Sequence, residues 1–267
     1  MGQEMSVQPQ PVRRQRMSGA LFISGALIGL VGNALHPHTA GLDAAATVQA
    51  IAQNGAWVAI HLAIIVAILL IIGGLVGLAD DMKGTAGEQF AQLGLAAALL
   101  GGAVVTVSTA IDGFVMKALS ISSGGASAAE SATALRIAVA VKDTDFGIWS
   151  IGILVFFGAA FACFGGAVVG SRRFPGWFGW IAIIGAAGST VAALLQIAAN
   201  GDVQAAETTF LASSLLLTLW VLALGFRSWR GYGNEGALLF TPGTKRSFAA
   251  APGHASSVEQ PPGPIGG

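Results

Sequence analysis

The stretch AWVAIHLAIIVAILLIIGGLVGLA, residues 56–79, decides the fold of this chain. His61 is the only ionisable side chain in its 24 residues. A bilayer core about 30 Å thick is crossed by about 20 apolar residues in a helix. Because hydrocarbon offers no hydrogen-bond partner, the backbone of such a stretch must pair within itself, and a helix achieves this. The stretch therefore predicts a transmembrane helix.

Five further stretches are long and apolar enough to cross a membrane. They cover residues 17–35, 90–119, 146–169, 177–199 and 208–226. They are rich in Ala, Leu, Ile, Val and Gly and lack the alternation of polar and apolar residues in a membrane β-strand. The stretch 90–119 is longer than the bilayer is thick, so it either tilts or continues past the interface as an exposed helix. The predicted fold class is all-α, a polytopic transmembrane bundle of six helices.

The composition of the chain agrees with a membrane protein and excludes other classes. Of 267 residues, 54% are hydrophobic and 10% are charged, against about 25% charged in soluble domains. Lys and Arg number 13, as do Asp and Glu, so the formal net charge is zero. This balance excludes a nucleic-acid-binding protein that depends on bulk positive charge. The single cysteine, Cys163, excludes a disulfide framework and a metal site built from several cysteines.

The cations predict the orientation of the bundle. With six spans, ten of the 13 Lys and Arg residues fall on one side, and only Lys117, Arg136 and Lys142 fall on the other. The ten are Arg13, Arg14, Arg16, Lys83, Arg172, Arg173, Arg227, Arg230, Lys245 and Arg246. Loops rich in Lys and Arg stay in the cytoplasm. We therefore predict a multi-pass protein of the cytoplasmic membrane with both termini inside.

The segments outside the apolar stretches have their own signatures. Residues 1–16 are polar, and residues 227–267 are rich in Gly, Pro and Ser, so both are predicted to be disordered cytoplasmic tails. Between the third and fourth stretches, residues 128–141 favour a short helix lying on the outer surface.

Tryptophans near the ends of the stretches predict aromatic belts at the two membrane interfaces. Trp57 and Trp149 fall on the predicted outer side. The predicted inner side has Trp177, Trp180, Trp220 and Trp229.

Small residues recur at four-residue spacing in the first two stretches. Gly25 and Gly29 form one such pair, and Gly73 and Gly77 form another. This spacing removes side-chain bulk along one face and lets helices approach closely. The pairs predict either packing within the bundle or a face for a homodimer or a larger membrane complex.

Unusual polar residues gather on the predicted outer side. His36 follows the first stretch, His61 lies near the start of the second, and Asp112 lies near the end of the third. Asn33 and Gln196 fall at similar depth. Ionisable groups within spans are costly and are candidates for function. We therefore predict a polar cup, open to the outside, in which these five residues bind a small ligand.

Several chemistries could use the cup, and the sequence does not choose between them. His36 and His61 could ligate haem b, or they could bind a metal ion together with His38 and Asp112. A pair of His61 and Asp112 could serve a proton-linked small-solute carrier, or, with Ser108, a hydrolase. The simplest alternative is that His61 and Asp112 pair only to hold the helices together. We expect a ligand-binding protein or an accessory subunit rather than an enzyme, with a carrier or a haem-binding redox subunit as alternatives, and we assign no catalytic residue.

Three short segments carry a family resemblance. They are GNALHP at residues 32–37, WVAIH at 57–61 and FPGWFGW at 174–180. The chain resembles a broad set of bacterial and archaeal membrane proteins with six or seven spans, known as domains of unknown function. Its richness in Ala and Gly is similar to that of actinobacterial proteins. The resemblance implies the topology and supplies no activity.

Overall fold

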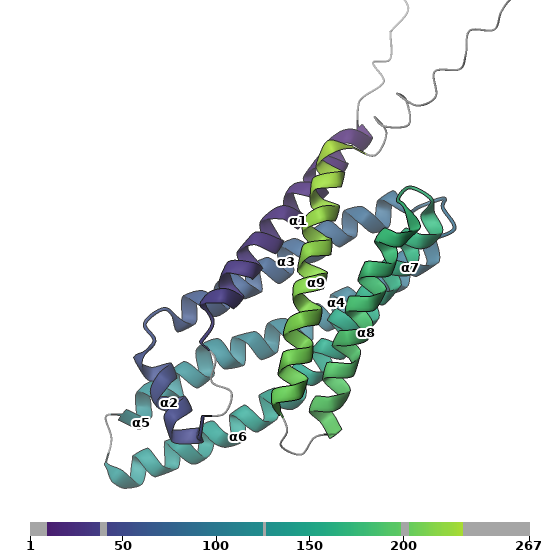
Figure 1. The fold of residues 1–267 in the computed structure, drawn as a ribbon. Coiled ribbons are helices and arrows are strands. Elements are labelled where there is room, and N and C mark those ends of the chain that lie inside the picture. The colour runs from purple at the N-terminus through teal and green to yellow at the C-terminus, as the bar shows by residue number, and fades with distance from the viewer. Residues whose placement is uncertain (1–9, 38–41, 125–126, 199–202, 232–267) are drawn as a thin grey trace, which may run out of the picture. The chain divides into compact units, whose positions relative to one another are not determined.

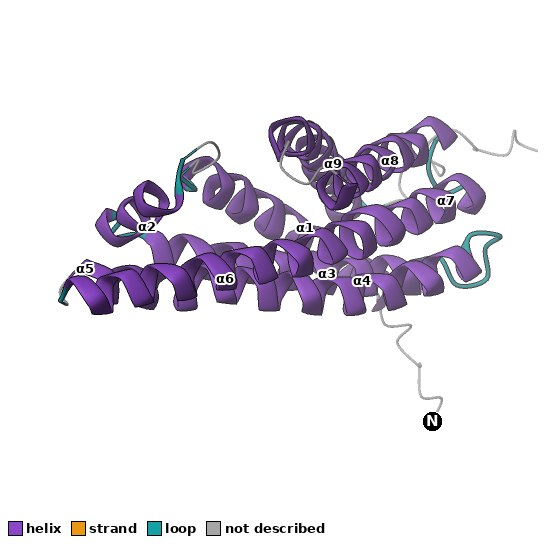
Figure 2. Cartoon of the chain, turned by 90° about the horizontal axis from the view of Figure 1, so that it is seen from below, coloured by secondary structure: helices purple, strands orange, loops and turns teal. Residues whose placement is uncertain are grey.

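The computed structural model describes residues 10–37, 42–124, 127–198 and 203–231. Within these ranges the chain forms helices and short connections and no strand (Figures 1 and 2). Six of the helices are long and apolar enough to cross a membrane, namely Val12–Leu35, Trp57–Asp81, Glu88–Ser123, Ala128–Ser171, Gly176–Ala198 and Gln204–Arg230. The predicted all-α class and the six apolar helices are therefore confirmed.

Some of the helices are joined end to end by a short π-helix. Their bounds are α1 (Gln10–Leu35), α2 (Ala44–Gln53), α3 (Trp57–Asp81), α4 (Glu88–Ala110), α5 (Lys117–Gly124), α6 (Ala128–Gly152), α7 (Phe161–Ser171), α8 (Gly176–Ala198) and α9 (Val203–Arg230). A π-helix, η1 (Ile111–Met116), joins α4 to α5. A second π-helix, η2 (Ile153–Ala160), joins α6 to α7.

Two helices reach further than the apolar stretches predicted. Helix α1 begins at Gln10, and α9 ends at Arg230. Residues 10–16 and 227–230 are therefore helical instead of belonging to disordered tails. The rest of the two predicted tails, residues 1–9 and 232–267, lies outside the described residues.

Close packing of α1 against α3 accounts for the spaced glycines. A Cβ added at Gly25 would lie 2.9 Å from the Ile71 side chain, and one at Gly29 would lie 3.3 Å from the Ala67 side chain. On α3, a Cβ at Gly73 would meet Leu21, and one at Gly77 would meet Ser18. Helix packing within the chain therefore accounts for both faces.

The core and the lipid-facing surface are both apolar, as expected of a membrane bundle. Phe22 of α1, Leu75 of α3, Phe164 of α7 and Leu224 of α9 are fully buried in one extended core cluster. Large aliphatic side chains are exposed on the outside of the spans, such as Leu100 of α4 at 69% and Ile184 of α8 at 60%. Such exposure is costly in water, so these side chains indicate contact with lipid.

The tryptophans divide into two groups, and the predicted belts are only partly correct. Trp177, Trp180 and Trp229 are at least half exposed, as interface residues should be. Trp57 and Trp220 are 1% and 2% exposed, so for these two the prediction was wrong. The Trp220 indole N–H donates to the Phe178 carbonyl across 2.8 Å, so a buried polar group is satisfied inside the bundle.

A second, smaller cluster lies at one end of the bundle, where α2, α5 and the first half of α6 meet (Figure 1). The helix Ala128–Ser171 has 44 residues, which is about 66 Å and roughly twice a bilayer core. The segment 128–141, predicted as a short surface helix, is thus the start of a continuous helix. The apolar side chains of α2, Val48 and Ile51, are buried in the cluster.

Candidate functional site

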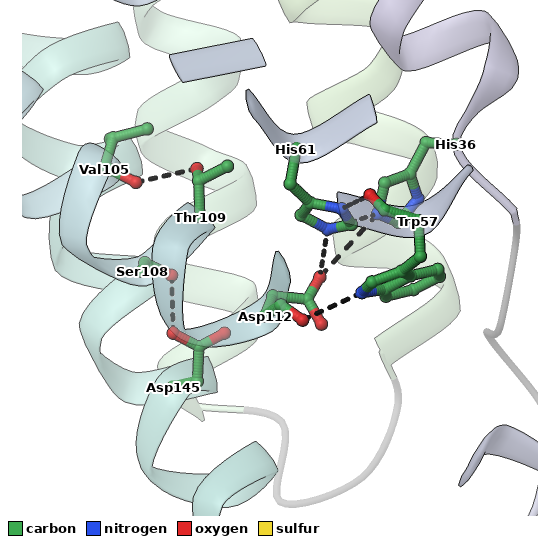
Figure 3. A network of polar contacts seen from close by, with 8 residues as sticks. All are labelled: His36, Trp57, His61, Val105, Ser108, Thr109, Asp112 and Asp145. Atoms are coloured by element: carbon green, nitrogen blue, oxygen red, sulfur yellow. Dashed lines mark hydrogen bonds and ion pairs between the residues drawn. The ribbon is translucent and has the colours of Figure 1, made fainter. Parts of the chain in front are cut away.

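Three predicted site residues meet at the end of the bundle that carries α2. His36 follows α1, His61 lies in α3 and Asp112 lies in η1 (Figure 3). His61 Nε2 is 2.9 Å from Asp112 Oδ2 and 3.2 Å from His36 Nε2. His36 Nε2 is 3.7 Å from the same Asp112 oxygen. These three residues are called the triad below.

The orientation of His61 is fixed by the turn of α3 that precedes it. The His61 side chain is 2% exposed. Its Nδ1 lies 2.7 Å from the Trp57 carbonyl oxygen, which can only accept a hydrogen bond. Nδ1 therefore carries a proton, and Nε2 points toward Asp112 and His36.

Trp57 holds the triad together from one side. Its indole N–H donates to the Asp112 carbonyl oxygen across 2.9 Å. Its ring centroid lies 4.6 Å from that of His61 and 5.2 Å from that of His36. One buried side chain thus contacts all three residues, one of them through a hydrogen bond.

The backbone around Asp112 lets η1 pack closely against α3. Asp112 lies in the first turn of η1, and π-helical turns are rare and often found at functional sites. The next residue is Gly113, where an added Cβ would lie 2.5 Å from the His61 Cβ. Only a residue without a side chain lets the helix come this close to α3.

The triad forms part of the wall of a cavity of about 570 Å³. Its apolar wall includes Trp57, Phe146, Trp149 and Phe210. Besides the triad, its polar wall includes Asn33, Lys142, Asp143, Asp145, Gln196 and Glu207. Asp112, Asp143, Asp145 and Glu207 supply four carboxylates, against a single Lys, so the charged groups of the wall are mainly acidic.

Asn33 and Gln196, the other two predicted site residues, line the cavity but are held by other partners. The Asn33 side-chain amide donates to the Gly29 carbonyl across 2.9 Å. The Gln196 amide oxygen accepts a hydrogen bond from Ser150 across 2.9 Å. His38, predicted as a metal ligand together with the triad residues, lies outside the described residues.

Ser108, predicted as the possible nucleophile of a hydrolase with His61 and Asp112, is hydrogen-bonded to a different residue. The Ser108 hydroxyl donates to Asp145 Oδ1 across 2.7 Å (Figure 3). A nucleophile needs its general base at hydrogen-bond distance, and the hydrogen bond of Ser108 goes to a carboxylate on α6 instead. The arrangement is therefore a pair, Ser108 with Asp145, beside the triad.

The distance between the two histidines bears on the haem alternative. Two axial ligands on opposite sides of an iron ion are separated by two metal–nitrogen bonds, roughly 4 Å at about 2 Å each. The two Nε2 atoms are 3.2 Å apart and share a carboxylate oxygen. This spacing suits ligands on the same side of an ion, not on opposite faces of a porphyrin.

Sequence reasoning did not assign Trp57, Asp145, Lys142 or Glu207 to the site. For Trp57 a signal was present, because Trp57 and His61 are four residues apart and share one face of a helix. For Asp145 the sequence gives only its position at the predicted outer start of the fourth stretch, and for Glu207 it gives no comparable signal. The place of both residues depends on how α6 and α9 pack around the cavity.

A model of the family described as a domain of unknown function (DUF4386) matches residues 17–225, most of the chain. The chain therefore belongs to this family, as the resemblance of its short segments had indicated. Neither the curated proteins nor the solved structures contain a significant match to the chain.

Proposed function

For this member of the DUF4386 family, we propose the function of an integral membrane protein that binds a small cationic ligand, such as an organic amine or a metal ion, in the cavity beside the triad. The protein would act alone or as an accessory subunit of a larger membrane complex. The observation that carries the proposal is the acidic wall of the cavity. Four carboxylates, one of which is Asp112 of the triad, and one ammonium group line the same space as His36 and His61.

The size and chemistry of the cavity suit a small molecule. Ligand sites usually enclose about 300–1,000 Å³, with a mostly apolar lining and a few polar groups that fix orientation. The cavity of about 570 Å³ falls in this range. Trp149 and Phe210 lie 5.6 Å apart by ring centroids and give it an aromatic side. Aromatic faces attract cations, which agrees with the charge of the wall.

The rest of the bundle favours binding over passage. At the other end, the core is filled by large apolar side chains, including Phe22, Leu75, Leu78 and Leu224. A carrier must open its site to both sides of the membrane. The packing therefore favours a site that is reached from one end.

Thermal unfolding of the purified protein tests the proposal. A ligand that binds only the folded state raises its stability, by about 2.7 kcal/mol at 100 times its dissociation constant. We expect small organic amines to raise the melting temperature and matched carboxylic acids to leave it unchanged. Asp145→Asn should reduce the effect, while Glu88→Gln, 24 residues before Asp112 on the same long helix, should not. Equal stabilisation by amines and carboxylic acids would contradict the proposal.

A proton-linked carrier is the second candidate, and the contact between His61 and Asp112 favours it. The two side chains lie 2.9 Å apart within apolar spans, where ionisable pairs often relay protons. Proteoliposomes with an internal pH indicator distinguish the candidates. A carrier acidifies or alkalises the lumen when an amine is added, and this flux disappears in His61→Ala. A binding protein shows the melting-temperature shift without the flux.

A further inference from the structure

We propose that His36, His61 and Asp112 bind one zinc ion, as a three-ligand site whose fourth position opens into the cavity. The inference rests on the proposed function, because it names a cation that the acidic cavity holds. The three ligand atoms are His36 Nε2, His61 Nε2 and Asp112 Oδ2. They come from three different segments, so their meeting is a property of the tertiary fold.

The distances between the ligand atoms fit a tetrahedral ion. The triangle with sides of 2.9, 3.2 and 3.7 Å has a circumscribed circle of radius about 1.9 Å. A tetrahedral zinc ion with bonds of about 2.05 Å places any three of its ligands on a circle of about 1.9 Å. An ion can therefore sit slightly above the plane of the three atoms, at bonding distance from each, without a change in their positions.

The hydrogen bonds around the triad match those of a metal site. A histidine that binds a metal usually donates its other ring nitrogen to a backbone carbonyl or a carboxylate. His61 Nδ1 does so to the Trp57 carbonyl. Its Nε2 then faces a carboxylate oxygen at 2.9 Å, a contact that either a proton or a metal ion between the two atoms can satisfy.

The donor set selects the kind of ion. Two imidazole nitrogens and one carboxylate oxygen suit zinc and its neighbours, whereas Mg²⁺ and Ca²⁺ prefer oxygen ligands alone. Zinc sites with three protein ligands commonly leave the fourth position to water or a bound molecule. All three triad residues line the cavity, so the fourth position faces it. A ligand of the cavity would then contact the ion directly.

Cobalt binding to the full-length protein tests the site. The protein is purified in detergent through a tag without histidine, stripped with a chelator and titrated with Co²⁺. Tetrahedral Co²⁺ absorbs far more strongly in the visible range than octahedral Co²⁺. We expect one strongly absorbing ion per chain, displaced by one equivalent of Zn²⁺. Absence of this signal would overturn the proposal and leave a structural His–Asp contact.

Single variants assign the signal to the triad. We expect His36→Ala and Asp112→Asn to weaken cobalt binding by about 100-fold or more, because loss of a mere outer-shell partner already costs about 10–100-fold. His36 is 29% exposed at the end of α1, so its removal tests the ligand without disturbing the core. His254→Ala, in the C-terminal segment, is the matched control and should bind as the unaltered protein does. Unchanged binding in His36→Ala would overturn the proposal.

The failure of this proposal is distinguishable from failure of the cavity proposal. The amine series is repeated on the metal-free and the cobalt-loaded protein. Amine stabilisation without tetrahedral cobalt would overturn the zinc site and leave the cavity proposal standing. Tetrahedral cobalt at the triad without amine stabilisation would uphold the zinc site and restrict the cavity to metal ions.

Discussion

At the scale of single residues, Gly113 is where the site depends most on the absence of a side chain. A Cβ there would lie 2.5 Å from the His61 Cβ. We expect Gly113→Ala to cost about 1–3 kcal/mol of unfolding free energy, because the extra methyl group forces the helices apart. Chemical denaturation of the detergent-solubilised protein measures this. Cobalt binding should weaken as well, because His61 would move away from Asp112.

Gly147 is the matched control for Gly113. It also lies in a helix, α6, but nothing is within 4 Å of an added Cβ. Alanine there should stabilise the protein by up to about 1 kcal/mol, as expected for a glycine in a helix interior. If Gly113→Ala proved as harmless as Gly147→Ala, the close approach of η1 to α3 would be wrong.

The residues of the site show what sequence reasoning can and cannot predict. The sequence could bring His36, His61 and Asp112 together because successive spans run in opposite directions. The end of one span and the start of the next therefore lie at the same end of the bundle. Trp57 was assigned to the interface because a tryptophan at a span end usually lies there. Its burial comes with the cluster that it shares with Val48 and Ile51 of α2, and membership of that cluster has no sequence signature.

At the scale of elements, Lys117 holds the short helix α2 in place. Its ammonium group donates to the carbonyls of Ile51, Ala52 and Asn54, at 2.8–3.0 Å. These carbonyls are at the C-terminal end of α2, where a helix runs out of its own donors. Those of Ile51 and Asn54 also accept a long backbone hydrogen bond, from Asn54 N–H and Trp57 N–H at 3.3 Å each. We expect Lys117→Met to cost about 1–3 kcal/mol, with the loss confined to α2.

Hydrogen exchange with mass spectrometry locates the effect of Lys117→Met. Amides of residues 44–53 should exchange faster in the variant, and those of α8 should not change. Lys142→Met is the control, because Lys142 is exposed and makes no hydrogen bond or ion pair among the described residues. An equal effect of both variants would show that loss of charge, not loss of the cap, is responsible.

The packing of α1 on α3 separates the two interpretations of the spaced glycines. Gly25→Val would place side-chain atoms where the Ile71 side chain and the Ala67 carbonyl now lie, 2.9 and 3.0 Å from a Cβ. We expect a loss of about 1–3 kcal/mol of stability. The mass measured by light scattering should stay the same. A variant that kept its melting temperature but lost an oligomer would instead favour a homodimer face.

The positions of the helices follow the hydropathy of the sequence closely. Hydropathy does not predict where a π-helix interrupts an α-helix or how far a helix extends beyond its apolar stretch. Each apolar stretch became a helix, because the bilayer leaves the backbone no other choice. The π-helices η1 and η2 lie inside such stretches, and their composition does not differ from that of the α-helices around them. The first half of α6 is held by the second cluster, in which Ala138 is buried together with Met116.

At the scale of the whole molecule, charge and polarity separate along the bundle. The cavity and its carboxylates lie at the end where α1 finishes and α3 begins. Arg14, Asp80, Asp81 and Lys83 form ion pairs at the opposite end of the same two helices. Ion pairs at a membrane interface are cheaper than the same charges inside it. The two ends are therefore chemically distinct, and the predicted orientation turns the ion-paired end toward the cytoplasm.

Labelling of single cysteines in intact cells identifies that end. Cys163→Ala removes the only cysteine, and two exposed alanines offer matched positions. Ala86 lies between α3 and α4, and Ala129 lies at the start of α6. Because Lys and Arg are concentrated on the Ala86 side, the positive-inside rule places it in the cytoplasm. We expect a membrane-impermeant maleimide to label Ala129→Cys in intact cells and Ala86→Cys only after permeabilisation. The reverse pattern would contradict the predicted orientation and turn the cavity toward the cytoplasm, where its ligand would have to be sought among intracellular cations.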